Sequence, residues 1–326
     1  MEINIENTKL NNFKLDKVNL TIMQRLNENS KCSLQELSSE LNISKPSVKN
    51  RVEYLKNEKI LLKSTLVLNF DNLGYEAWII YLKTQDHYEN KDFYKKLNLD
   101  NIVEIISLYG DYSLYIKFII KNQNEKEKII TNILEKINVK NYLYQKVNFY
   151  DIIPAKKFID EKKDMISNPH KLNLTKLDLN ILRLLSKNPQ ISNIEIAKEL
   201  NESFQKISYH VRDLYRSRTI LISPYFSNIF LFNMLSYMIT FDLKDKEIKE
   251  KFVNFLIMYK NTNGVSVFEG KTDIMCIFIS KSLFEFHEFF EVISKKFPNK
   301  INEFNISLIQ TQYYMKHFPS CIEKFI

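Results

Sequence analysis

The strongest constraint on the fold is an internal repeat, because residues 15–55 align without a gap on residues 174–214. Identical residues stand at equivalent positions of the two copies, including Leu15/Leu174, Leu20/Leu179, Ile22/Ile181, Leu26/Leu185, Ser33/Ser192, Glu36/Glu195, Leu41/Leu200, Ser44/Ser203, Val52/Val211 and Leu55/Leu214. Agreement at this level with no insertion indicates duplication. We therefore expect the same structural unit twice in one chain.

Each copy is expected to form three short helices. The first helix is predicted from apolar residues that recur at helical spacing, namely Leu15, Val18, Ile22 and Leu26. Ser33 is the expected cap of the second helix, because Glu36 follows three residues later in the capping-box pattern. Ser44 is the expected cap of the third helix, with Pro46 in the first turn, where a missing N–H costs nothing.

The polar face of the third helix is the predicted DNA contact. Its residues are Lys45, Ser47, Lys49, Asn50 and Arg51 in the first copy and Gln205, Lys206, Ser208, Tyr209 and Arg212 in the second. A helix N-terminus favours phosphate, and Asn or Gln can pair with adenine edges, which contributes about 1–3 kcal/mol of discrimination. The alternative interpretation is a solvated face on a helical scaffold that contacts other proteins.

The arginines support the first interpretation. All six lie within residues 15–63 and 174–223, namely Arg25, Arg51, Arg183, Arg212, Arg216 and Arg218. Arginine offers a planar fork suited to phosphates and guanine edges, so we expect Arg216 and Arg218 to meet phosphates. A net charge of +8 is consistent with a polyanionic partner.

A β-rich segment follows each helical unit, in the order strand, helix, strand, strand, helix, strand. The expected elements are 77–84, 91–99, 102–110, 113–120, 124–137 and 142–153 in the first copy, and 235–243, 247–258, 264–270, 273–280, 283–297 and 301–315 in the second. This order is the ferredoxin-like βαββαβ arrangement. The fold class is therefore α+β, with two helix-turn-helix domains alternating with two ferredoxin-like domains.

The predicted domains follow from these segments. They are an N-terminal tail (1–14), helix-turn-helix domain 1 (15–63), ferredoxin-like domain 1 (64–154), a Lys-rich linker (155–173), helix-turn-helix domain 2 (174–223) and ferredoxin-like domain 2 (224–326).

No metal, cofactor, disulfide framework or membrane segment is predicted. The cysteines, Cys32, Cys276 and Cys321, are far apart and include no C-x-x-C pair. Apolar runs are much shorter than the roughly 20 residues that span a bilayer, and the N-terminus does not resemble a signal peptide. We expect a reduced, cytoplasmic protein.

Residues 15–61 resemble the helix-turn-helix of the leucine-responsive regulatory protein/AsnC family, and residues 103–120 resemble the turn of that family's effector domain. The resemblance implies a regulator of transcription that binds double-stranded DNA and responds to an amino acid or related metabolite. Family members are usually one such unit that dimerises through its sheets. This chain is thus expected to be a covalent pseudo-dimer that associates further, as a dimer of pseudo-dimers.

The resemblance also implies effector-binding residues, namely Gly110, Asp111, Tyr112, Gly270, Thr272 and Asp273. Two departures from the family matter. Ser113 replaces the usual Asp in the first turn, and the second turn reads Gly-Lys-Thr-Asp from residue 270. The recognition helices differ as well, because Lys49-Asn50 corresponds to Ser208-Tyr209. Two unlike recognition helices on one chain predict a preference for two unlike DNA half-sites.

Two alternatives stay open. Siroheme decarboxylases share this architecture, but they need basic and His residues in the effector domains to hold carboxylates and move protons. The segments here have no Arg, and His87, His287 and His317 are scattered, so we predict that the protein is not an enzyme. A protein-interaction module is suggested by aromatic clusters at 284–290 and 311–318, although core packing accounts for them more simply.

Overall fold

The computed structural model describes residues 16–85, 93–152, 173–227, 234–316 and 318–323. The predicted tail 1–14, nearly all of the predicted linker 155–173, and residues His87 and His317 lie outside the described residues.

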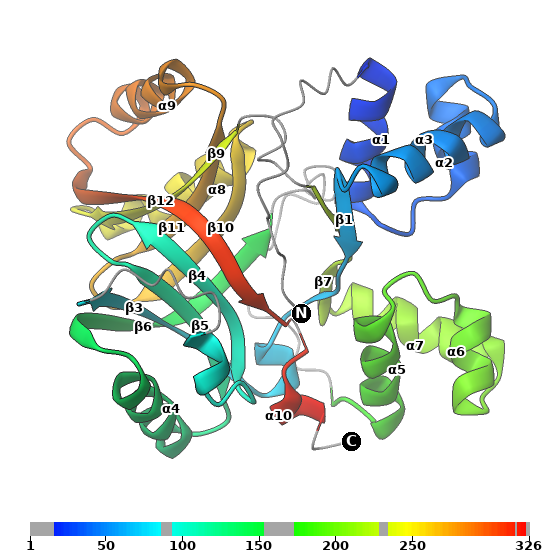
Figure 1. Cartoon of the computed structure of the whole chain (residues 1–326), viewed down its shortest axis with the longest axis horizontal. Helices are drawn as coiled ribbons and strands as arrows, with labels where there is room; N and C mark the ends of the chain where they lie inside the picture. Colours follow the sequence, from blue (N-terminus) through cyan, green and yellow to red (C-terminus); the bar gives the residue numbers. More distant parts are fainter. Residues whose placement is uncertain (1–15, 86–92, 153–172, 228–233, 317, 324–326) are drawn as a thin grey trace.

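The two repeats fold into two helix-turn-helix units, as predicted. Head 1 consists of α1 (Lys17–Glu28), α2 (Leu34–Leu41) and α3 (Lys45–Asn57), and head 2 of α5 (Lys176–Lys187), α6 (Asn193–Leu200) and α7 (Phe204–Arg216). Both heads lie on the same side of the central β-barrel (Figure 1). In each head, the turn of the helix-turn-helix lies between the second and third helices, α2–α3 in head 1 and α6–α7 in head 2.

Local sequence explains where these helices begin and end. Ser33 and Ser192 form complete capping boxes with the Glu three residues later. Asn42 and Asn201 end α2 and α6 in the left-handed conformation, each with φ of 52°. Asn tolerates this conformation better than most residues, so the tight turn before each third helix is encoded locally.

The short strands that follow head 1 pair with the short strands that follow head 2. β1 (Leu61–Ser64) pairs with β8 (Tyr225–Ser227), and β2 (Val67–Leu68) pairs with β7 (Ile220–Ile222). Each pairing therefore joins the strand after one head to the strand after the other. The two heads are linked through these exchanged ribbons as well as through the chain.

Eight strands close into one barrel that both copies build. The first copy contributes β3 (Glu76–Thr84), β4 (Ile102–Tyr109), β5 (Leu114–Ile120) and β6 (Val139–Ile152), and the second β9 (Leu235–Leu243), β10 (Thr262–Glu269), β11 (Ile274–Ser280) and β12 (Ile301–Met315). The order is β10-β11-β9-β12-β4-β5-β3-β6. Within each copy the strand order is ferredoxin-like, and the copies join antiparallel at β6–β10 and β12–β4.

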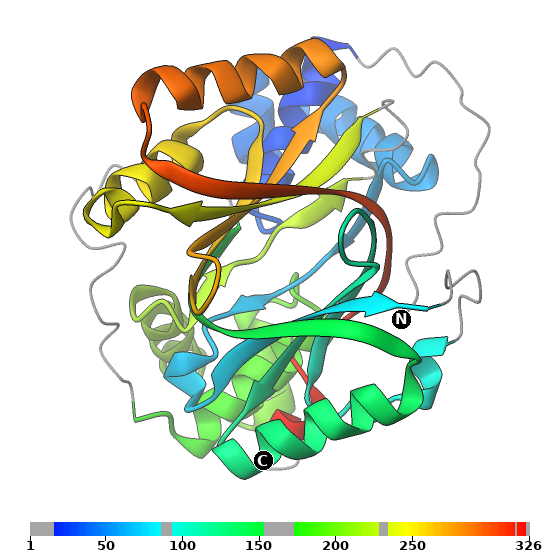
Figure 2. The same ribbon diagram turned by 90° about the vertical axis from the view of Figure 1, so that its left-hand side faces the viewer.

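Helices cover the outside of the barrel. α4 (Gln123–Lys136) packs on the first copy, and α8 (Lys249–Met258) and α9 (Leu283–Lys296) pack on the second. α4 and α9 lie on the side opposite the heads (Figures 1 and 2). The shorter elements are η1 (Asp71–Leu73), η2 (Phe93–Lys96), η5 (Lys246–Ile248) and α10 (Ser320–Glu323).

The predicted helix at 91–99 is shorter than expected. Its described part forms only the 3-10 turn Phe93–Lys96. Asn98 ends it, because its side-chain oxygen accepts a hydrogen bond from the backbone N of Asp100 at 3.1 Å. Such a local turn competes with helix continuation.

Within the described ranges, no helix is both long and apolar enough to cross a membrane.

Candidate nucleic-acid interface

The third helix of each head presents most of the predicted DNA-contact residues to solvent. Ile207, Val211 and Leu214 bury the inner face of α7, as Val48, Val52 and Leu55 do in α3. The exposed predicted residues are Lys45, Lys49 and Asn50 in head 1 and Gln205, Lys206, Tyr209, Arg212 and Arg216 in head 2. Ser47 and Ser208 are half-buried. The polar face therefore points away from each head, as a DNA-reading face must.

Arg51 is placed differently from its neighbours. Its Nη1 donates to Asp16 Oδ2 at 2.6 Å and to Asn19 Oδ1 at 2.9 Å, which ties α3 to the start of α1. The backbone N–H of Asn19 and the Arg51 guanidinium lower the pKa of the Asp16 carboxyl. Head 2 makes the same tie with another pair, since His210 Nδ1 lies 2.7 Å from Asp178 Oδ1. Contact of Arg51 with DNA stays a prediction, and this guanidinium already has a structural role.

The exposed lysines have weak partners that DNA can replace. Lys49 lies 3.8 Å from Glu53, and both side chains are exposed. Lys206 pairs with Glu202 at 2.8 Å, also near the surface. Exposed pairs of this kind contribute little to stability, so their cations are available to phosphates.

Arg216 and Arg218 lie at the other end of the recognition helix. Arg216 is the last residue of α7. Arg218 lies two residues later, with φ of 57°. Lys59 stands at the equivalent position of head 1 with φ of 55°. These residues are far along the helix from its N-terminal turn, which agrees with a phosphate contact and remains a prediction.

Phe204 is a surface residue that sequence reasoning missed. It is the first residue of α7 and is exposed, at the position that Lys45 takes in head 1. Its apolar side chain offers no hydrogen bond to DNA, so the pattern of donors on the third helix does not include it. The gap-free alignment of the two copies carried the signal, because it places Phe204 on the same helix face as predicted contacts.

Positive charge is concentrated in the heads. Residues 15–63 contain nine basic and six acidic residues, and residues 174–223 contain eight and five. Each head thus has a net charge of +3, which together makes up most of the +8 of the chain. A cationic surface around an exposed helix is the electrostatic pattern of a nucleic-acid interface.

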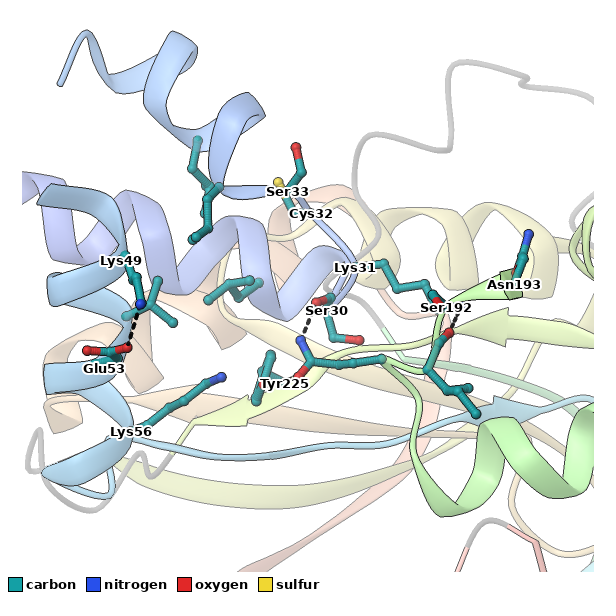
Figure 3. A pocket seen from close by; sticks show the side chains of 16 residues that line it. Ser30, Lys31, Cys32, Ser33, Lys49, Glu53, Lys56, Ser192, Asn193 and Tyr225 are labelled. Carbon is teal, nitrogen blue, oxygen red and sulfur yellow. Dashed lines mark hydrogen bonds and ion pairs between the residues drawn. The ribbon is translucent and has the colours of Figure 1, made fainter. Parts of the chain in front are cut away.

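A cleft of about 560 Å³ is lined by residues of both heads. Hydrogen bonds between lining residues join the heads beside it. Gln190 Nε2 donates to Ser30 O at 2.9 Å, and Tyr225 Oη donates to Gln190 Oε1 at 2.7 Å. Lys31 Nζ donates to Ile191 O at 3.4 Å, and burial lowers the pKa of this ammonium. Figure 3 shows Lys31, Lys49 and Lys56 around the cleft. These contacts hold the two heads in one relative orientation.

The two predicted effector turns come together in the barrel. Asp111 and Tyr112 of the first turn and Thr272 of the second line one cavity of about 50 Å³ between the copies. The glycines of the turns allow close approach of the other copy. A Cβ at Gly110 would lie 3.0 Å from Ile306 O, and one at Gly270 would lie 2.8 Å from Gln145 Oε1.

Gln145 and Asp273 show how the second turn is held. Gln145 Nε2 donates to Thr272 Oγ1 at 2.6 Å, and Thr272 N donates to Gln145 Oε1 at 2.8 Å. Asp273 is buried and accepts from Leu243 N at 2.8 Å and from Lys249 Nζ at 3.3 Å. Burial raises the pKa of Asp273, but its hydrogen bonds and nearby ammonium groups outweigh this and lower it overall. Asp273 is absent from the cavity lining, so its predicted effector contact is not supported by its position.

Comparison with known proteins identifies the class first. A family described as winged helix-turn-helix DNA-binding matches residues 15–61 and 174–219, which are the two heads. The chain thus contains two DNA-binding domains of the winged helix-turn-helix class.

The relatives then identify the family. The regulator Ptr1 of Methanocaldococcus jannaschii is 34% identical over 111 residues, covering 33% of this chain and 74% of Ptr1. A helix-turn-helix transcriptional regulator of Pyrococcus abyssi is 27% identical over 146 residues, covering 43% of this chain and 99% of that protein. The regulatory protein AsnC of Escherichia coli is 24% identical over 132 residues, covering 40% and 86%. The chain belongs to the leucine-responsive regulatory protein/AsnC family of DNA-binding transcriptional regulators.

A solved structure corrects one prediction. The siroheme decarboxylase NirDL matches 94% of this chain and 96% of its own length, with a TM-score of 0.63 and 14% identity. At this identity the match establishes a shared fold over both copies. The prediction that the protein is not an enzyme is contradicted, because an enzyme has the same whole-chain architecture. The prediction rested on the absence of Arg and the scattering of His in the ferredoxin-like segments. Because regulators and an enzyme share this architecture, that criterion does not separate the two classes.

Proposed function

We propose that the chain regulates transcription as a covalent pseudo-dimer, with each head reading one half-site of double-stranded DNA. The observation that carries this proposal is the placement of both heads on one side of a barrel that both copies build. Exchanged strands and cross-head hydrogen bonds then hold the heads in one arrangement. A rigid pair of recognition helices is what two half-sites in successive major grooves require.

The half-sites are expected to differ. Head 1 presents Lys49 and Asn50 where head 2 presents Ser208 and Tyr209. Asn pairs with adenine, whereas Tyr and Ser do not offer that bidentate contact. The operator is therefore an asymmetric pair of sequences, in contrast to the palindrome that a symmetric dimer prefers.

Selection from a random duplex pool, at one near-physiological salt concentration, tests this function. Two unlike enriched half-sites are expected, with specific binding much tighter than the non-specific Kd of roughly 10⁻⁴–10⁻⁶ M. Asn50→Ala should relax base preference in one half-site only. Asn57→Ala, at the far end of the same helix, is the matched control and should leave the preference unchanged. No enrichment, or equal affinity for a symmetrised site of either half, would contradict the proposal.

We infer further that the barrel cavity takes a small amine-bearing effector, such as an amino acid. Asp111, Asp242 and Glu303 line it with a single cation, Lys271. An excess of carboxylates attracts an ammonium group. At about 50 Å³ the cavity must widen for the ligand, which would couple binding to the placement of the copies. A thermal-shift screen of amino acids tests this, with Asp111→Asn expected to abolish the shift.

Further association is also proposed. Exposed apolar side chains stand on equivalent outer positions of the two long strands, Tyr142 and Tyr144 on β6 and Phe304 and Ile306 on β12. Such a patch favours a dimer of pseudo-dimers. Light scattering should give twice the chain mass, and the monomer mass in a Tyr142→Ser/Phe304→Ser variant. A monomeric wild type would disprove this association.

The second candidate function is tetrapyrrole chemistry of the siroheme-decarboxylase kind. The whole-chain likeness to NirDL favours it, because the likeness spans both copies and their arrangement. A carboxylate-rich tetrapyrrole would need cations, and the cavity between the turns supplies only Lys271. Titration with an iron tetrapyrrole, followed by absorbance, tests this candidate. A saturable spectral change that Lys271→Met weakens would support it.

A further inference from the structure

Head 2 presents aromatic side chains where head 1 presents hydrogen-bonding ones. Phe204 is 53% exposed and Tyr209 is 55% exposed on α7. The equivalent residues of head 1 are Lys45 and Asn50. Monomeric proteins do not usually leave several large apolar side chains on one small surface without a contact. The replacement therefore indicates that the two heads recognise different chemistry.

The exposed apolar side chains of head 2 lie around the first half of α7. Ile194, in the first turn of α6, is 56% exposed. Its neighbour Asn193 donates through Nδ2 to Ser208 Oγ at 3.3 Å, which brings the start of α6 against α7 beside Tyr209. Ser208 is one helical turn after Phe204, so Phe204 and Ser208 lie on one side of α7. The exposed apolar groups thus surround the N-terminal half of the recognition helix.

Cations lie beside the aromatic side chains and further along the same helix. The Arg212 guanidinium lies 5.6 Å from the centroid of the Tyr209 ring, within range of a cation–π interaction. Lys206 and Arg216 are exposed on the same helix. Apolar side chains on a cationic helix fit a polyanion that also offers apolar groups. The major groove of DNA has one such group, the 5-methyl of thymine, between two phosphate backbones.

We propose that head 2 recognises thymine methyl groups in the major groove, with Phe204 and Tyr209 as the contacting residues. This inference rests on the proposed DNA-binding function. Residues in the first turns of a recognition helix contact base edges, and Phe and other apolar groups contact the thymine methyl. The Arg212 contact restricts the Tyr209 ring and leaves the arginine beside it for a phosphate or a guanine edge.

Single replacement of thymine by deoxyuridine tests the proposal, because deoxyuridine lacks only the 5-methyl group. The probe is a duplex selected from the random pool by the full chain, with each thymine replaced in turn. Affinity should fall about fourfold for each contacted methyl, as expected for the burial of one carbon. The sensitive thymines should cluster in one half-site.

Variants then assign the sensitive thymines to head 2. In Phe204→Ala the ratio of thymine to deoxyuridine affinity should fall to one at one or more sensitive positions, and in Phe204→Leu part of the ratio should remain. Lys45→Ala, at the equivalent position of head 1, is the matched control and should weaken binding without changing any ratio. Phe204 is half exposed, so unchanged circular dichroism and melting temperature are expected for its variants.

Each other result overturns the proposal. An enriched operator whose thymines all tolerate deoxyuridine would remove the inference and leave the DNA-binding function intact. Ratios that persist at every position in Phe204→Ala combined with Tyr209→Ala, or that Lys45→Ala abolishes, would place the methyl contact elsewhere and leave the aromatic side chains to a protein partner. The absence of any enriched sequence would remove the DNA-binding function together with this inference.

Discussion

At the residue scale, Lys117 is a buried lysine in the barrel. It is 3% exposed on β5 and faces Glu104 across the pairing of β4 and β5. Burial lowers the pKa of Lys117 to about 8, although Glu104 and Asp71 act in the opposite direction. Burial raises the pKa of Glu104. The pair therefore makes the stability of the barrel depend on pH.

Stability should rise with pH in the window from about 8 to 10.5, the folded and ordinary pKa values of Lys117. In that window the unfolded chain binds the proton and the folded chain does not, so folding is favoured as protons become scarce. Between pH 7.5 and 9.5 the gain is about 1–2 kcal/mol. Urea unfolding at the two pH values measures it. Lys117→Met should not show the gain, and an equal gain in the variant would assign it to another group.

Arg51 supports a second prediction at this scale. Arg51→Ala removes two hydrogen bonds to α1 and should lower the free energy of unfolding by about 1 kcal/mol. Lys45→Ala changes an exposed residue, so its effect on stability should stay within about 0.5 kcal/mol. Urea titration measures both. If Arg51→Ala left stability unchanged while DNA affinity fell, its guanidinium would serve DNA alone.

At the element scale, the turns between β4 and β5 and between β10 and β11 depend on the opposite copy. Gly110 packs against Ser307 and Ile306 of β12, and Gly270 packs against Gln145 of β6. A turn of one copy therefore packs against a strand of the other copy twice, once at β4–β12 and once at β10–β6. A side chain at either glycine would push a turn away from the strand it meets.

Gly110→Ala should destabilise the protein by about 1–3 kcal/mol, the usual cost of forcing extra atoms into a packed site. The new Cβ would overlap Ser307 Oγ, and Ile306 O would lie 3.0 Å away. Adding Ser307→Gly should recover part of the loss, because the side chain in contact is removed. Gly74→Ala is not a suitable control, since Gly74 has φ of 74°. Additive effects of the two substitutions in chemical denaturation would rule out this contact.

At the scale of the whole molecule, the heads are held by contacts that neither copy makes alone. The strand exchange, the Gln190–Ser30 bond and the closed barrel all join residues from different copies. Because the heads are held in one arrangement, the protein should bind two half-sites tightly only at one spacing.

Inserting five base pairs between the half-sites of a selected operator rotates one of them by about half a helical turn. A rigid pair of heads cannot follow, so affinity should fall to that of a single half-site. Inserting ten base pairs restores the rotation but not the distance, and should recover little. Electrophoretic titration at constant salt measures all three duplexes. Full affinity for the five-base-pair insertion would show that the heads move independently.

The sequence by itself determined the duplication, the three helices of each head, the caps at Ser33 and Ser192, and the strands that form the barrel. Caps, apolar periodicity and turns are local, so neighbouring residues carry the whole signal. Only the tertiary structure decided the closed barrel, the structural role of Arg51 and the buried position of Asp273. Each of these depends on contacts between residues far apart in the chain, and no local pattern encodes which distant partner a side chain meets.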